Sequence, residues 1–215
     1  MEYKCIIFDC DGVLVDSEAI STTILVNMAN SIGANIEMEG AVDFFAGKSL
    51  GSCLAFIESR INRKIPDGFE QTFRKRTFEA FRTDLQPIDG IHSLLEKITI
   101  PYCVASSGPV DKIRLNLTTT DLIRKFEGNI FSSYDIGSWK PEPDIFLHAA
   151  EQMGFEAGEC VVIEDSLAGI IAARTGGFEV FGFANEKNRD IFANEGARVF
   201  SDMDTLGRYL LNNRH

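Results

Sequence analysis

The chain has 215 residues, of which 45% are hydrophobic and 25% are charged, and its formal net charge at pH 7 is -11. This composition is that of a globular protein with a sizeable core, and the acidic balance argues against nucleic acids and anionic membranes as partners. No apolar run approaches the roughly 20 residues that cross a bilayer, and the N-terminus lacks the pattern of a signal peptide. We therefore expect a cytoplasmic protein.

Six short apolar segments are predicted to be strands. Each is closely followed by Gly, Asp, Ser or Asn, which is typical of buried parallel strands that end in loops. The segments are residues 4–8, 102–105, 130–131, 160–163, 179–183 and 198–200, and the pattern is weakest at 130–131.

Helical patterns alternate with these segments over residues 100–200. They are predicted at residues 110–119, 144–153, 167–176 and 186–194. The alternation predicts an α/β fold with a doubly wound parallel sheet, because right-handed crossovers bring parallel strands into one sheet. Such sheets bind their ligands at the carboxyl ends of the strands.

The long interval between the first and second predicted strands contains only helical patterns. They lie at residues 18–32, 50–61 and 69–81, with apolar residues at i, i+3 and i+4 spacing. We expect this interval to form a helical cap subdomain, residues 17–87. It would be inserted into an α/β core domain that comprises residues 1–16 and 88–215.

The five cysteines are scattered along the chain and form no C-x-x-C pair. This spacing argues against both a disulfide framework and a structural zinc site. Cys5, Cys103 and Cys160 fall in apolar predicted strands, so we expect them to be buried thiols.

Two aspartates directly follow the first predicted strand. Asp9 and Asp11 are spaced i, i+2, so their side chains would point the same way if the strand continued, and Gly12 lets the chain turn away. Two neighbouring carboxylates repel each other, so one tends to hold its proton or to share a cation. On its own, the pattern is also that of an ordinary strand that ends in an Asp-Gly turn.

Three further segments carry polar side chains at the ends of predicted strands or before a helix. Ser106 and Ser107 follow the second strand, and Lys140 precedes a predicted helix. Glu164 and Asp165 follow the strand at 160–163. Taken singly, these segments are equally well explained as a Ser/Gly loop, a surface lysine and an acidic helix start.

Together, in order and spacing, the four segments resemble the haloacid dehalogenase superfamily. The helical interval is similar to the branch that contains beta-phosphoglucomutase and the sugar-phosphate phosphatases, and residues 131–150 are similar to bacterial 6-phosphogluconate phosphatases. The resemblance implies a Rossmann-like core and a Mg²⁺-dependent phosphomonoester hydrolase that acts through an aspartyl-phosphate. The substrate would be a small phosphorylated metabolite, such as a sugar phosphate or 6-phosphogluconate.

The resemblance also implies roles for individual residues. Asp9 would be the nucleophile and Asp11 the general acid/base. The Mg²⁺ ligands would be Asp9, the backbone carbonyl of Asp11, Asp165 and, as a neighbour or a ligand, Glu164. The groups that hold the transferred phosphoryl would be Ser106, the backbone N–H of Ser107, and Lys140.

The cap is expected to meet the substrate through residues 45–50. Lys48 and Arg74 would contact its distal groups, although each is also explained as a solvated surface cation. A cap hinged near Asp16 and Pro87 would close over the site and exclude bulk water.

Two alternatives share the same core residues. By the same resemblance, a hexose-phosphate mutase carries a histidine and an arginine at positions matched here by Ser21 and Leu50, which favours a hydrolase. A phospho-receiver protein also uses clustered aspartates, a lysine and Mg²⁺, but it needs no cap. A capped single site requires no partner subunit, so we expect a monomer or a weak oligomer.

Overall fold

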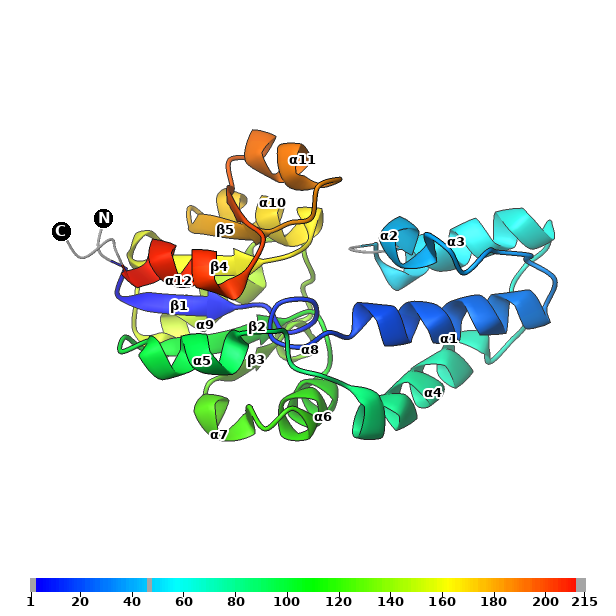
Figure 1. The fold of residues 1–215 in the computed structure, drawn as a ribbon, viewed down its shortest axis with the longest axis horizontal. Coiled ribbons are helices and arrows are strands. Elements are labelled where there is room, and N and C mark those ends of the chain that lie inside the picture. Colours follow the sequence, from blue (N-terminus) through cyan, green and yellow to red (C-terminus); the bar gives the residue numbers. More distant parts are fainter. Residues whose placement is uncertain (1–2, 46–47, 212–215) are drawn as a thin grey trace.

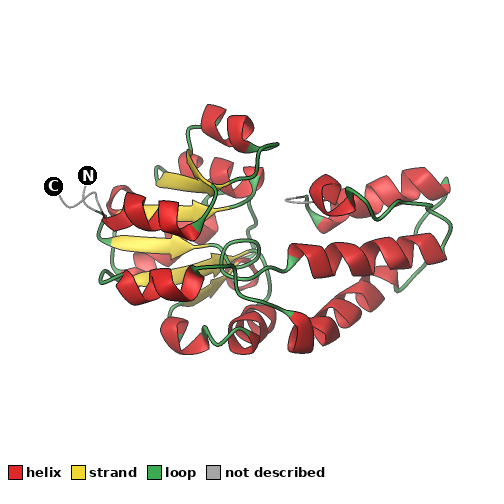
Figure 2. Ribbon diagram, in the orientation of Figure 1, coloured by secondary structure: helices red, strands yellow, loops and turns green. Residues whose placement is uncertain are grey.

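The computed structural model describes residues 3–45 and 48–211. Its centre is a six-stranded parallel sheet with strand order β3-β2-β1-β4-β5-β6, covered by helices on both faces (Figures 1 and 2). The strands are β1 Cys5–Phe8, β2 Tyr102–Ser106, β3 Ile130–Ser132, β4 Cys160–Glu164, β5 Glu179–Phe183 and β6 Arg198–Phe200. The predicted α/β class and doubly wound sheet are confirmed.

Strand β1 lies in the middle of the sheet and is buried on both faces. Phe8 packs into the apolar cluster on one face and Ile7 into the cluster on the other, as the strand period of two requires. The register places Phe8 beside Val104 of β2 and Ile163 of β4. These three strands therefore end at one edge of the sheet, and the residues that follow them lie close together.

Two layers of helices cover the sheet. Apolar side chains of α5, α6 and α12 pack on one face, and those of α9, α10 and α11 pack on the other. These helices, with two short ones, are α5 Ile91–Lys97, α6 Val110–Thr119, α7 Ile123–Phe126, α8 Ser133–Ile136, α9 Asp144–Met153, α10 Leu167–Thr175, α11 Arg189–Asn194 and α12 Met203–Leu211. No helix in the described ranges is long and apolar enough to cross a membrane.

The bounds of α6 and α9 are the predicted ones, whereas α11 starts at Arg189 and not at residue 186. The reason is a turn in which the Asn185 side chain accepts hydrogen bonds from the N–H groups of Lys187 and Asn188 (2.8 and 3.2 Å). Helices α5, α7, α8 and α12 were not predicted. They have only seven, four, four and nine residues, and periodicity is read over windows of about 11–18 residues.

Helices α1 to α4 form a second group beyond the carboxyl ends of the strands (Figure 1). They are α1 Glu18–Ser31, α2 Ala41–Phe45, α3 Leu50–Ile61 and α4 Phe69–Asp84, of which α2 was not predicted. They pack around an apolar cluster of their own that includes Val26, Ile57 and Phe73. Helix α4 also reaches the core domain, because Phe81 packs into the cluster on one face of the sheet. The division at residues 17 and 87 stays a prediction.

The two chain segments that join this helical group to the sheet run side by side. An antiparallel bridge pairs Val15 with Pro87, and the N–H of Asp16 donates to the carbonyl of Gln86 at 2.9 Å. Both connections therefore leave the core at the same place, next to the loop after β1.

All five cysteines are free thiols. Cys5, Cys103 and Cys160 are fully buried in strands, as expected, and Cys10 and Cys53 are also buried. The thiols thus contribute to packing, in agreement with the interpretation of the sequence.

Candidate active site

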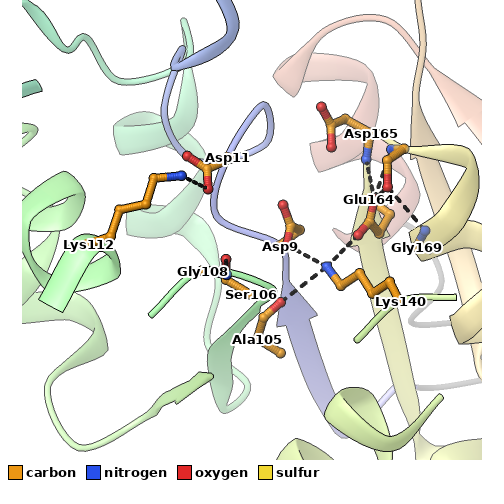
Figure 3. Close-up of polar contacts among 11 residues, drawn as sticks. Asp9, Asp11, Ala105, Ser106, Gly108, Lys112, Lys140, Glu164, Asp165 and Gly169 are labelled. Atoms are coloured by element: carbon orange, nitrogen blue, oxygen red, sulfur yellow. Dashed lines mark hydrogen bonds and ion pairs between the residues drawn. The ribbon is translucent and has the colours of Figure 1, made fainter. Parts of the chain in front are cut away.

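The predicted site residues of the core meet at the carboxyl edge of β1, β2 and β4 (Figure 3). Asp9 follows β1 directly, Ser106 is the last residue of β2, and Glu164 is the last residue of β4. All three are buried. The parallel register brings them together although they are far apart in the sequence.

Lys140 contacts the ends of all three strands. Its ammonium lies 2.5 Å from Asp9 Oδ1 and 2.6 Å from Glu164 Oε1, and it also donates to the carbonyl of Ala105 at 3.4 Å. The side chain is only 6% exposed, so the charge needs partners. Burial, the largest influence, lowers the pKa of Lys140, but the two carboxylates outweigh it and hold this pKa above its ordinary value.

Asp9 has too little positive charge around it. Burial raises the pKa of Asp9 to about 7, Glu164 adds to this effect, and Lys140 only partly opposes it. A further cation close to Asp9 would stabilise the ionised form of its carboxylate.

Glu164 is engaged through both of its oxygens. Oε1 accepts from Lys140, while Oε2 accepts from the N–H groups of Asp165 (2.9 Å) and Ser166 (2.8 Å) and from the Ser166 hydroxyl (2.9 Å). A Cβ atom at Gly169 would overlap the Glu164 carboxylate. In this arrangement Glu164 anchors Lys140 and the start of α10.

Asp165 stands next to the loop that follows β1. A Cβ at Gly12 would overlap the Asp165 carboxylate, and Gly12 has a φ of +77°, which an L side chain rarely adopts. Burial, followed by repulsion from Glu164, Asp9 and Glu18, raises the pKa of Asp165 well above its ordinary value. Glycine at position 12 thus lets two acidic segments approach closely.

This set of oxygens fits a magnesium ion. Among the described residues, no three His, Cys, Asp or Glu side chains form a ready metal cage. Both carboxylate oxygens of Glu164 and of Asp11 already accept hydrogen bonds, which leaves the Asp9 and Asp165 carboxylates and backbone oxygens. Mg²⁺ is usually held by one or two carboxylates and keeps several waters. Burial, together with the neighbouring carboxylates, raises the pKa values of Asp9 and Asp165, and a bound cation would offset both effects.

Asp11 is bound by a different lysine. Lys112 on α6 donates to Asp11 Oδ2 at 2.7 Å, while Ser17 and Asn116 donate to Oδ1 at 2.8 and 3.1 Å. Burial, the largest influence, raises the pKa of Asp11, but Lys112 and Ser17 outweigh it, and this pKa lies below its ordinary value. These three donors were not predicted from the sequence. The available signal was the i, i+4 spacing of Lys112 and Asn116, which places both on one face of the helix predicted after the second strand.

The loop after β2 offers polar groups to the same edge. The hydroxyl of buried Ser106 accepts from the N–H of Gly108 at 3.1 Å, which leaves its proton for another acceptor. Ser132 donates to the carbonyl of Gly108 at 2.7 Å and fixes the loop. Ser107, which lies between Ser106 and Gly108 in the chain, is half-buried.

No contact within the described ranges links Lys48 or Arg74 to these strand-end residues. The exposed Lys48 ammonium lies 3.3 Å from the centroid of the Phe44 ring, and Arg74 forms an exposed pair with Glu70 at 2.7 Å. Ala46 and Gly47 of the predicted substrate loop lie outside the described residues.

The family model of the haloacid dehalogenase-like hydrolases matches residues 3–177. The chain belongs to this family. This hydrolase is 30% identical over 205 residues to the 6-phosphogluconate phosphatase of Escherichia coli K12, a match that covers 94% of this chain and 92% of the relative. Hexitol phosphatase A of the same organism is 29% identical over 187 residues, covering 84% of this chain and 82% of the relative. The resemblance of the four segments is thereby confirmed for the family.

A solved structure supports the same assignment. A haloacid dehalogenase-like protein of unknown function from Agrobacterium tumefaciens C58 is 32% identical and superposes on the hydrolase with a TM-score of 0.89. The match covers 99% of this chain and 100% of the other. The fold that carries the strand-end residues is therefore the fold of the family.

Asp165→Asn should stabilise the metal-free hydrolase at neutral pH. Because folding raises the pKa of Asp165, the folded state binds its proton more tightly than the unfolded state, and stability falls as pH rises above about 4. We expect the midpoint of thermal unfolding to rise by about 2–4 °C in chelator at pH near 7, which corresponds to ~1 kcal/mol in a chain of this size. The exposed Asp135→Asn is the control. A lower midpoint in Asp165→Asn would contradict the account of this carboxylate.

Proposed function

We propose that the chain is a Mg²⁺-dependent phosphomonoester hydrolase that transfers the phosphoryl group of a small phosphorylated sugar or sugar acid to Asp9 and then to water. The observation that carries the proposal is the contrast between two aspartates two residues apart. Asp9 is buried against Lys140 at the end of β1, while Asp11 is held by Lys112. One carboxylate is thus available as a nucleophile and the other for proton transfer.

The first obstacle to this reaction is charge. A carboxylate and a phosphate charge ~4 Å apart repel by roughly 4 kcal/mol at an effective dielectric constant of about 20. Lys140 offsets part of this repulsion because its ammonium contacts Asp9 directly. Mg²⁺, held by Asp9, Asp165 and the backbone carbonyl of Asp11, would supply further positive charge when bound.

The second requirement is position. Lys140 binds Asp9 Oδ1, and within the described residues no donor occupies Oδ2, which we assign as the attacking atom. The Ser106 hydroxyl and the backbone N–H of Ser107 would orient the phosphoryl oxygens, which makes in-line attack mainly a matter of placement. Asp11 would give a proton to the leaving oxygen and later take one from water.

Relatives of the chain support the substrate class. The Escherichia coli relatives named above are a 6-phosphogluconate phosphatase and hexitol phosphatase A. A sugar acid also carries a carboxylate away from its phosphate, and Lys48 is the cap cation proposed to meet it.

Hydrolysis should depend on Mg²⁺ and on Asp9. Asp9→Asn should reduce turnover of a generic phosphomonoester by at least about a thousandfold, because the nucleophile is lost. Mg²⁺ should raise the midpoint of thermal unfolding of the wild type but not of Asp165→Asn, since only a competent site gains binding energy. Two results would contradict this proposal. One is undiminished turnover after exhaustive chelation, and the other is activity within about tenfold of wild type in Asp9→Asn.

Lys48→Ala should reduce the preference for a phosphorylated sugar acid over its uncharged sugar-phosphate counterpart. The reason is the loss of the one cation in the cap loop proposed to pair with the substrate carboxylate. The measurement is kcat/KM for 6-phosphogluconate and for glucose 6-phosphate in both proteins. Arg74→Ala, which removes the cap cation that pairs with Glu70, serves as a second cap variant. An equal preference in wild type and Lys48→Ala removes the role of Lys48 and leaves the phosphatase assignment intact.

A hexose-phosphate mutase is the second candidate, and the cap argues against it. A mutase must bind a bisphosphate in two orientations, which requires a second cation-rich phosphate site, and Ser21 and Leu50 carry no charge at the matching positions. Incubation with beta-glucose 1-phosphate and catalytic glucose 1,6-bisphosphate should therefore release inorganic phosphate and form little glucose 6-phosphate. Efficient isomerisation without release of phosphate would reverse this assignment.

A further inference from the structure

Asp11 is held by two side chains of α6 to which the scheme above gives no role. Lys112 donates to Oδ2 and Asn116 to Oδ1, and Ser17 adds a third donor to Oδ1. Lys112 lies two residues, and Asn116 six residues, after the start of α6. The carboxylate is thus bound through both oxygens, from the core helix on one side and from the start of the cap on the other.

The chemistry of these donors defines the form of Asp11 that they hold. A lysine ammonium and an asparagine N–H can only donate, so the carboxyl group that they bind accepts on both oxygens, as Asp11 does once it has given its proton to the leaving oxygen. Asp11 faces Lys112, while Lys140, Glu164 and Asp165 lie on the other side of Asp9 (Figure 3). Asp11 therefore lies apart from the other charged groups around Asp9. This position suits Asp11 as a base, because water attacks an aspartyl-phosphate in line, from the side of phosphorus opposite Asp9.

The surroundings of Asn116 and Lys112 restrict both side chains. Asn116 is fully buried, and its Oδ1 has no hydrogen-bond partner among the described residues. A buried unpaired carbonyl costs stability, so the contact with Asp11 is what this side chain contributes. The Lys112 ammonium lies 5.6 Å from the ring centroid of Phe81, a fully buried residue of α4, which limits its positions.

We propose that Lys112 and Asn116 are positioning residues that hold Asp11 as the base for hydrolysis of the aspartyl-phosphate. The inference rests on the proposed function, since it needs a phosphorylated Asp9. In this step Asp11 takes a proton from water as the water oxygen bonds to phosphorus. The bond between phosphorus and the Asp9 oxygen breaks with its electron pair, and the products are the Asp9 carboxylate and inorganic phosphate.

The decay of a preformed phospho-enzyme measures this step directly. The full-length protein would be phosphorylated with acetyl phosphate and Mg²⁺, and the loss of phosphate from Asp9 followed by rapid quench. Lys112→Met and Asn116→Leu should slow this decay by about 10–100-fold, less than the ~10²–10⁴-fold contribution of a complete general base. Arg114→Met, which removes an exposed cation of the same helix that pairs with Glu127, should not slow it.

Two further readouts separate positioning from folding. With p-nitrophenyl phosphate, whose leaving group departs without a proton from Asp11, kcat/KM reports only steps up to phosphoryl transfer and should change by less than about threefold in Lys112→Met, while kcat falls with the decay rate. Lys112→Arg should restore most of the decay rate, because it restores a charged donor. Asn116→Leu should keep or raise the midpoint of thermal unfolding while slowing decay, since it removes the unpaired carbonyl.

The results that overturn the inference are distinct from those that overturn the proposed function. Unchanged decay in both variants, or an equal fall of kcat and kcat/KM without slower decay, shows that Lys112 and Asn116 do not position the base. A wild-type protein that turns over phosphomonoesters without any phospho-enzyme refutes the proposed mechanism itself, and the inference with it.

Discussion

The site depends on a lysine that is buried between two carboxylates. The Lys140 side chain is 6% exposed and those of Asp9 and Glu164 are 9% and 1% exposed, so none of the three charges is balanced by water. Removal of one member of such a buried set leaves an uncompensated charge, which is strongly destabilising. The contact holds the end of β1, the end of β4 and the segment before α9 in one place. It therefore requires the strand order that makes β1 and β4 neighbours.

A second lysine gives the two aspartates different electrostatic surroundings. Lys140 pairs with Asp9 and Lys112 pairs with Asp11, although the aspartates are only two residues apart. Without a metal, burial and then Glu164 outweigh Lys140 and raise the pKa of Asp9, whereas Lys112 and Ser17 outweigh burial and lower the pKa of Asp11. A cation bound between Asp9 and Asp165 would bring Asp9, the proposed nucleophile, back to its ionised form at neutral pH. The contrast between the two pKa values is thus set by contacts from three separate segments.

The fold and the strand-end residues were predictable because both follow from local patterns. Continuous apolar strands that end in Asp9, Ser106 and Glu164 mark the edge of a parallel sheet, and the chain order of these strands is visible in the sequence. The donors to Asp11 were not found, because Lys112 and Asn116 act through a contact more than one hundred residues away in the chain. Short helices such as α5 and α8 give too few apolar positions to show a period. The role of Arg74 as a substrate contact stays a prediction, and its contact in the structure is the neighbouring Glu70.

The central claim is that the phosphoryl group passes through Asp9, and the most direct measurement is its location during turnover. The wild-type protein would be mixed with a phosphomonoester and Mg²⁺, quenched in acid within the first turnover, and its peptides analysed by mass spectrometry. The account predicts a phosphorylated peptide in which the modified residue is Asp9, at a level that rises and falls with turnover. Release of inorganic phosphate with no modified Asp9, or with the phosphoryl group on another residue, would contradict it.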